Sequence, residues 1–266
     1  MCKSDNELTT QNTQNIVNHF IWKSREHSKL VKILKIPIEL NKIDCLTRLD
    51  DKEFRMACLR EMKSQLNILS RSDGSVILSH GNTVVIASMY GPVEAKIQKT
   101  LIDKASVEVV FRPKTGLSFV QDRLKESVIK STCESALLTM IHPRTSVILT
   151  IQELQDEGSL LACCINAACL ALINSGISMR FTIAAVSCII NVDNEIILDA
   201  NHIQSNKCRA SMSFVFDSQK QHLVTSQTGG NFSKDQYDEC LIKCREASKL
   251  IFEYYKQVVK KYAPII

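Results

Sequence analysis

The sequence contains few glycines, and none of them forms a phosphate-binding loop. Its eight glycines are isolated or lie in turns, so neither GxGxxG nor GxxxxGK[ST] occurs. The GxSxG motif of α/β-hydrolases and the HExxH motif of zinc proteases are also absent. The sequence therefore gives no local support for a dinucleotide-binding protein, a kinase or a hydrolase of these classes.

Long hydrophobic runs and secretory features are lacking too. No apolar run approaches the roughly 20 residues that a membrane helix needs. The chain begins with the polar stretch MCKSDNELTTQNTQN, which has no apolar core of the kind found in signal peptides. We therefore expect no membrane association and a reducing compartment, either the cytosol or the nucleus.

Paired metal-binding cysteines are missing, although cysteine itself is abundant. The chain has 11 cysteines, an odd number, and no CxxC pair, which argues against a zinc site. Cys240 and Cys244 are one helical turn apart without a second ligand pair, and we expect both to face the core. Four others lie in apolar runs, where a thiol packs as a small core residue: Cys163, Cys164, Cys169 and Cys188. No cofactor and no metal are predicted.

The composition that remains is that of an ordinary globular protein. The 266 residues are 45% hydrophobic and 23% charged, which allows one large domain or two small ones. The net charge of +5 is compatible with an RNA or DNA partner, but many other proteins share such a balance.

Turn residues divide the chain after about Met62 into strand-like and helix-like segments. β-Branched and apolar runs predict nine strands: 65–70, 76–80, 83–90, 107–111, 146–154, 181–192, 195–199, 210–217 and 223–228. Helical periodicity predicts three helices: 123–140, 159–173 and 234–261. The order of strands, helix, strand, helix, strands and helix predicts an α+β, or mixed α/β, fold in a single domain.

Three local signals mark the ends of these segments. Gly91-Pro92 is predicted to end the third strand, and Gly176 to end the second helix. Ser233 with Gln236 forms a capping box at the start of the last helix.

Residues 1–60 differ from the rest of the chain. They contain no glycine and consist of polar runs followed by segments dotted with Lys and Arg. We expect an N-terminal extension over 1–60 that is partly disordered, and one folded domain over 61–266.

The basic residues near the first predicted helix are candidates for RNA contact. Arg112, Lys114, Arg123 and Lys125 lie in or just after one loop that leads into this helix. A loop with several cations before a helix N-terminus can bind a phosphate backbone. The alternative is an ordinary solvated surface, because Lys and Arg are common on all protein surfaces.

Two acidic groups are candidates for metal binding, and each has a simpler explanation. Asp156 and Glu157 precede the second helix, where carboxylates also serve as N-terminal caps. Asp193, Glu195 and Asp199 form the second group, but Asp193 fits a hairpin turn and Asp199 the end of a strand.

Five motifs between Met62 and the C-terminus form a distinctive set. They are Leu69–Ser75, Tyr90–Glu94, Arg112–Lys114, His142–Thr145 and Leu160–Ile177. In this combination they resemble the RNase PH family, and within it the subunits of the RNA exosome ring. The resemblance implies an RNase PH-like fold of the ribosomal protein S5 domain 2 type, with two βαβα-like halves around a shared core.

The resemblance also implies a chemistry that this chain has lost. Active members degrade RNA from the 3′ end with phosphate as the nucleophile, which requires cations for the phosphate and an acid for the leaving oxygen. Where they carry a phosphate-binding arginine before the first helix, this chain has Gln121 or Asp122, with Arg123 as a substitute only if the loop shifts. Their second arginine, before the second helix, has no counterpart in residues 157–161. Asp199 matches the first of their two aspartates, but Ser205 replaces the second, and a hydroxyl is a poor acid at neutral pH.

The resemblance therefore implies a non-catalytic subunit of the exosome ring. Such a subunit pairs with another RNase PH-like subunit within a six-membered ring, and works with RNA-binding cap subunits, a separate catalytic nuclease and RNA. The implied location is the nucleus and nucleolus, and also the cytoplasm. The alternatives are an active phosphate-dependent 3′–5′ exoribonuclease, a metal-dependent nuclease that uses Asp156, Asp193 or Asp199, and a stand-alone RNA-binding domain.

Overall fold

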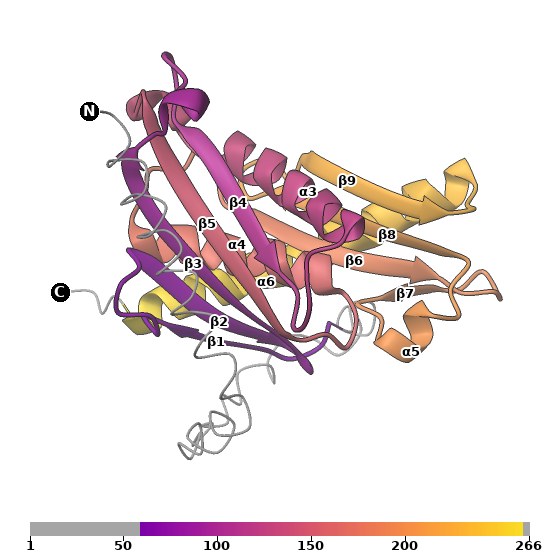
Figure 1. The fold of residues 1–266 in the computed structure, drawn as a ribbon. Coiled ribbons are helices and arrows are strands. Elements are labelled where there is room, and N and C mark those ends of the chain that lie inside the picture. The colour runs from indigo at the N-terminus through magenta and orange to yellow at the C-terminus, as the bar shows by residue number, and fades with distance from the viewer. Residues whose placement is uncertain (1–58, 263–266) are drawn as a thin grey trace, which may run out of the picture. The chain divides into compact units, whose positions relative to one another are not determined.

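The strand-like segments form two β-sheets in the computed structural model, which describes residues 59–262 (Figure 1). The predicted extension over residues 1–60 lies outside the described residues, apart from Leu59 and Arg60. The mixed α/β fold class predicted from the order of the segments is confirmed. None of the helices in the described part is both long and apolar enough to cross a membrane.

The first sheet has five strands in the order β1-β2-β3-β5-β4. All neighbours are antiparallel except β4 and β5, which are parallel. Its strands are β1 (Met62–Leu66), β2 (Gly74–His80), β3 (Thr83–Glu94), β4 (Ser106–Arg112) and β5 (Thr145–Gln155). Side chains alternate along β2, so that Val76, Leu78 and His80 all point to the buried face.

The second sheet has four antiparallel strands in the order β7-β6-β8-β9. Its strands are β6 (Ile183–Ile190), β7 (Ile196–Leu198), β8 (Ala210–Asp217) and β9 (Leu223–Gly230). β6 reads as a nearly continuous apolar run because it is buried on both faces. One face packs against α4 (Leu160–Ser175) and the other against α6 (Lys234–Tyr262).

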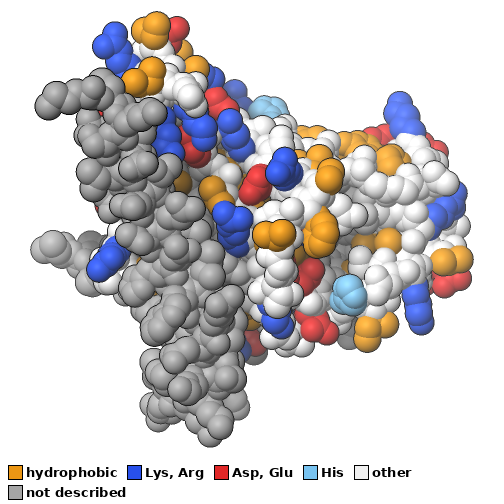
Figure 2. Space-filling view, in the orientation of Figure 1, with side chains coloured by type: hydrophobic (Ala, Val, Ile, Leu, Met, Phe, Trp, Pro, Cys, Tyr) orange, Lys and Arg blue, Asp and Glu red, His pale blue; other side chains and the backbone are white. Residues whose placement is uncertain are grey.

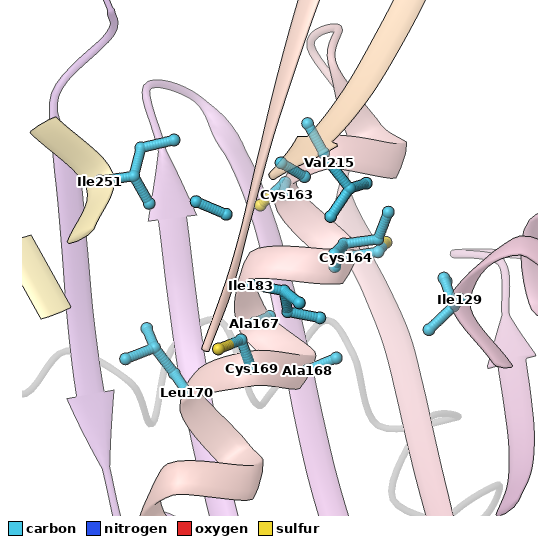
Figure 3. Close-up of a cluster of buried hydrophobic side chains, with 14 of the residues drawn as sticks. Ile129, Cys163, Cys164, Ala167, Ala168, Cys169, Leu170, Ile183, Val215 and Ile251 are labelled. Carbon is cyan, nitrogen blue, oxygen red and sulfur yellow. The ribbon is translucent and has the colours of Figure 1, made fainter. Parts of the chain in front are cut away.

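The helix α4 is the centre of the hydrophobic core. It packs against β2 and β3 of the first sheet and against β6 of the second. Twelve of its residues are buried, and most of these are Ala, Cys, Leu or Ile. Figure 3 shows Cys164, Ala168 and Leu170 of this helix among side chains from the strands and from α6. Each fully buried Leu or Ile contributes about 1.5–3 kcal/mol, so this helix carries a large part of the core's stabilisation.

The remaining helices lie at the edges of the two sheets. α3 (Val120–Ala136) packs along β4, and Figure 1 shows β9 of the second sheet beside it. The hydroxyls of Thr132 on α3 and Thr225 on β9 are 3.0 Å apart. The short elements are η2 (Ile97–Lys99), η3 (Thr139–Ile141) and α5 (His202–Ser205).

Several local predictions are confirmed. Gly176 adopts a left-handed conformation with φ of 72° and ends α4. Ser233 and Gln236 exchange the two hydrogen bonds of a capping box. Cys240 and Cys244 are fully buried, as are the four cysteines expected in apolar runs.

Three boundary predictions are wrong. The first strand, predicted over 65–70, is β1 at Met62–Leu66, because the chain leaves the extended conformation at Asn67, whose φ is 58°. β3 does not end at Gly91-Pro92 but continues to Glu94, with an irregular register against β5 after Tyr90. α3 covers Val120–Ala136 rather than 123–140. It ends early because Leu137 leaves the helix to form a β-bridge with Met179, and it begins early because Asp122 caps its first turn.

Candidate functional site

The predicted RNA-contact residues lie where β4 ends and α3 begins. Arg112, Lys114 and Arg123 are exposed, whereas the side chain of Lys125 is only 27% exposed. Lys125 Nζ lies 3.3 Å from Asp122 Oδ1 and 5.0 Å from the centre of the Phe111 ring. Three of the four predicted cations therefore face solvent, and the fourth is partly occupied by neighbours in its own chain.

Hydrogen bonds hold this region in place. Asp122 Oδ2 accepts from the Phe119 N–H at 2.9 Å, and Glu126 Oε1 accepts from the Phe111 N–H at 2.8 Å. Asp122 is buried, whereas Gln121 is exposed. The first turn of α3 thus carries a buried carboxylate at one of the two positions where the family resemblance expects a phosphate-binding arginine. A carboxylate at this position is stabilised by the positive end of the helix dipole, but it repels phosphate.

Glu153 on β5 is a carboxyl that is influenced by lysines of this loop and by other carboxylates. The pKa of Glu153 on β5 is raised by burial and by Asp156, is lowered by Lys125, and is raised again by Asp122. Lys114 also lowers it, more weakly. Burial and the two neighbouring aspartates thus outweigh the two lysines at this carboxyl.

The turn before α4 does not have the predicted cap. We expected Asp156 or Glu157 to cap this helix, but Ser159 occupies the N-cap position with φ of 56° and makes no side-chain cap bond. Asp156 Oδ1 instead accepts from the Gly158 N–H at 2.8 Å. The prediction is wrong because Gly158 and Ser159 both have positive φ, which turns the chain sharply between Asp156 and the helix.

The loop after Asp199 packs tightly on this turn. The His202 N–H donates to the Glu157 carbonyl at 2.8 Å. A Cβ atom at Gly158 would clash with the Ala200 carbonyl oxygen, so only glycine fits there. At the helix start, where the family resemblance expects a second arginine, Leu160 is buried in the core.

Asp199 lies in a buried ion-pair cluster with Arg60 and His80, which we call the Asp199 cluster. Arg60 Nε and Nη2 donate to the two carboxylate oxygens at 2.8 and 2.7 Å, and the Arg60 backbone N–H donates at 3.1 Å. His80 Nε2 lies 2.9 Å from Asp199 Oδ2, although neither ring nitrogen makes a hydrogen bond of ordinary geometry within the described residues. Arg60 Nη2 also donates to the Gly158 carbonyl at 3.0 Å, which joins the cluster to the turn before α4.

The environment of Asp199 favours its ionised form. Burial alone would raise the pKa of this carboxyl, but the His80 imidazole and the Arg60 guanidinium outweigh burial. Together they hold the pKa of Asp199 well below its ordinary value. Both oxygens of the Asp199 carboxylate thus accept hydrogen bonds inside the protein, and these contacts favour the anion.

Ser205 and Asp193, the other residues discussed with Asp199, are not part of the Asp199 cluster. Ser205 ends the short helix α5, and Asp193 is exposed in the turn between β6 and β7. Between Leu59 and Tyr262, no three His, Cys, Asp or Glu side chains come together in a way that could hold a metal ion. Asp156, Asp193 and Asp199, the candidates named for a metal-dependent nuclease, are thus not part of any such group within residues 59–262.

Two members of the Asp199 cluster, Arg60 and His80, were not predicted from the sequence. Arg60 falls within the predicted N-terminal extension, and His80 is one of six histidines that form no sequence motif. The alternation of β2 could have identified His80, because this residue lies on the same buried face as Val76 and Leu78. A histidine on that face needs a polar partner inside the protein.

Sequence comparison assigns most of the described residues to known family models. Domain 1 of the 3′ exoribonuclease family, RNase PH, matches residues 58–178, and its domain 2 matches residues 182–242. The exosome complex exonuclease RRP46 homolog of Oryza sativa subsp. japonica is 32% identical over 222 residues, covering 77% of this chain and 93% of that protein. The exosome complex component rrp46 of Schizosaccharomyces pombe is 30% identical over 207 residues, covering 73% and 91%.

Solved structures share the same fold. The crystal structure of rice Rrp46 superposes with a TM-score of 0.73 and 33% identity, covering 76% of this chain and 95% of that one. A chain of an archaeal exosome core superposes with a TM-score of 0.65 over 74% of this chain and 87% of that one. At 18% identity, the archaeal match shows the fold alone.

Proposed function

The chain belongs to the RNase PH family of 3′ exoribonucleases, and from that membership we propose that it is a ring subunit of the RNA exosome. The relatives named as exosome RRP46 proteins are matched over more than nine-tenths of their own length. Both domains of the family are represented in this chain. The proposed role is to support 3′-to-5′ RNA processing and degradation by building the ring and part of the RNA path.

We propose the partners that such a subunit requires. It pairs with another RNase PH-like subunit in a six-membered ring, and the ring carries RNA-binding cap subunits and a separate catalytic nuclease. The complex works in the nucleus and nucleolus, and also in the cytoplasm.

We propose further that this subunit is not itself catalytic. The observation that carries this proposal is the Asp199 cluster, because a buried carboxylate paired with Arg60 cannot give a proton to a leaving oxygen. The carboxylates of Asp122, Glu153 and Asp156 add a second reason, since they oppose the binding of inorganic phosphate beside α4. Ser205 supplies only a hydroxyl at the remaining acid position.

We propose that RNA is contacted by the loop between β4 and α3. Arg112, Lys114 and Arg123 are exposed and belong to no ion pair within the described residues, so they are available to phosphates. Lys125 was predicted alongside them, and we retain it as the weakest of the four because Asp122 and Phe111 already contact its ammonium group.

Two measurements test these proposals. The tagged full chain, purified gently from its own cells, should travel with other RNase PH-like subunits in one particle by native mass analysis, and a lone monomer would contradict the ring role. The purified chain should not degrade single-stranded RNA in the presence of phosphate or of Mg²⁺. Degradation that requires phosphate would instead establish an active phosphorolytic enzyme, and degradation that requires only Mg²⁺ would establish a hydrolytic nuclease.

A further inference from the structure

The connection between β4 and α3 carries an exposed hydroxyl group among the cations proposed for RNA contact. Thr115 is exposed, and it follows Arg112 by three residues and Lys114 directly. The N–H groups of residues 115–118 donate no hydrogen bond to any group within residues 59–262, and these four residues belong to no helix or strand (Figure 1). No regular structure would therefore have to be broken before an enzyme could bind this segment in an extended conformation.

The spacing of Arg112 and Thr115 is typical of substrates of basophilic protein kinases. These enzymes bind an arginine that lies three residues before the accepting Ser or Thr with carboxylates of their own, so the charge pattern of the substrate determines which hydroxyl is used. Between Leu59 and Tyr262, two hydroxyl residues have this spacing: Thr115 after Arg112, and Ser248 after Arg245.

The structure distinguishes these two hydroxyl groups. Ser248 is fully buried on α6, and its hydroxyl donates to the Arg245 carbonyl at 2.7 Å. Thr115 is followed by Gly116, where φ is 86° and an added Cβ atom would meet nothing within 4 Å. The next residue, Leu117, is 85% exposed. Space is therefore open on the C-terminal side of Thr115, and a kinase can reach this hydroxyl but not that of Ser248.

We propose that Thr115 is a phosphorylation site for a basophilic Ser/Thr protein kinase, and that its phosphate blocks RNA binding by the loop. In the reaction, the Thr115 hydroxyl oxygen attacks the γ-phosphorus of ATP and the bond from that phosphorus to the β-phosphate oxygen breaks. The hydroxyl proton passes to a base of the kinase, and ADP leaves.

The phosphate acts through its charge. It carries about −1.5 to −2 at pH 7 and is a strong hydrogen-bond acceptor. Because Arg112 and Lys114 are so close to it along the chain, it pairs with these cations and repels the phosphates of RNA. This effect rests on the proposed RNA contact and adds a means of regulating it.

The first test uses the purified full chain, ATP and calmodulin-dependent protein kinase II with its activators. Mass spectrometry of a proteolytic digest should find phosphate on Thr115 and none on Ser248. Arg112→Ala should lower the initial rate at Thr115 by about tenfold or more, because the kinase loses a charged hydrogen-bond partner. Arg245→Ala, which removes an exposed arginine from α6, is the matched control and should leave this rate unchanged.

The second test measures RNA affinity. The chain phosphorylated on Thr115 should bind single-stranded RNA about tenfold more weakly at about 0.15 M salt, and the slope of log K against log salt concentration should fall by about 1.4, as expected when two phosphate contacts are lost. A protein phosphatase should restore the affinity of the same sample. Thr115→Val treated with the kinase should bind like the untreated wild type, which controls for phosphate at other positions.

The remaining outcomes overturn the inference, and they identify the step that fails. A peptide of residues 109–121 is treated in parallel. If Thr115 of the full chain takes no phosphate, the folded loop is out of reach when the peptide is modified, and the charge pattern is not recognised when the peptide is not.

A phosphorylated chain that binds RNA as well as the unmodified chain would also overturn the inference. Arg112→Glu with Lys114→Glu then decides the fate of the proposed RNA contact. If this variant weakens RNA binding, the contact stands and only the phosphate switch fails. If it does not, the RNA contact fails as well.

Discussion

At the scale of single residues, Asp199 is a buried carboxylate whose two oxygens both accept hydrogen bonds from its own chain. Its Oδ1 accepts from Arg60 Nη2, and its Oδ2 accepts from both Arg60 Nε and the Arg60 backbone N–H. Such bidentate pairing with a guanidinium is among the strongest stabilisers of a carboxylate anion. The residue that the family resemblance expects to act as an acid therefore serves to join the start of the domain to the loop after β7.

Removal of Arg60 should destabilise the protein strongly. Arg60→Ala leaves Asp199 buried without its main partner, which we expect to lower the free energy of unfolding by about 3–5 kcal/mol. Lys63→Ala is the control, because it removes an exposed pair with Glu61 at 3.0 Å and should cost at most about 1 kcal/mol. Urea unfolding of the full chain measures both. Equal losses in the two variants would mean that the Asp199 cluster contributes no more than a surface ion pair.

The depressed pKa of Asp199 also predicts how stability depends on pH. A carboxylate whose pKa is lower in the folded state contributes stability above its unfolded pKa of about 3.9, and this contribution is lost as the pH falls through the folded value. The difference in the free energy of unfolding between wild type and Asp199→Asn should therefore be largest near pH 7 and should shrink below about pH 4.

The measurement is a series of urea unfolding curves between pH 3 and pH 7. Asp193→Asn removes an exposed carboxylate in the turn after β6 and should match the wild type throughout the series. A difference for Asp199→Asn that stays constant across the series would argue that the cluster acts through packing and not through charge.

At the scale of secondary-structure elements, the sequence was most informative where neighbours along the chain determine the structure. The small residues of α4, its glycine stop and the β-branched runs are local signals, so these elements were predicted within a few residues. The start of α3 was misplaced because the carboxylate that caps it, Asp122, lies inside the predicted loop. The Asp199 cluster joins residues that are 139 positions apart, and no local pattern brings Arg60 to Asp199.

The small side chains of α4 allow two sheets to approach the same helix. Ala168 is fully buried between them, so Ala168→Trp would force the neighbouring strands apart. Overpacking of a core usually costs about 1–3 kcal/mol, and a change this large should reach or exceed the upper end. For a domain of this size, such a loss lowers the melting temperature by roughly 6 °C or more. Lys130→Trp, on the exposed side of α3, is the control and should melt like the wild type. Identical melting of both variants would contradict the central position of α4.

At the scale of the whole molecule, net charge alone does not identify the surface that we propose for RNA contact. The chain carries +5 overall, but Figure 2 shows Lys and Arg side chains spread over the visible face with Asp and Glu among them. What distinguishes the loop between β4 and α3 is that its outward charges have one sign. Arg112, Lys114 and Arg123 face solvent, while the nearby carboxylate of Asp122 is buried.

This arrangement predicts a local effect on RNA affinity. Arg112→Glu with Lys114→Glu should weaken the binding of single-stranded RNA and reduce the dependence of affinity on salt, because each lost phosphate contact removes about 0.7 from the slope of log K against log salt concentration. Two lost contacts would lower the slope by about 1.4. Lys256→Glu with Lys260→Glu changes the net charge equally on the exposed side of α6 and serves as the control. If both double variants flatten the slope to the same extent, RNA responds to the overall charge of the molecule, and the loop has no special role. A reduction confined to the first variant would place the phosphate backbone at the junction of β4 and α3.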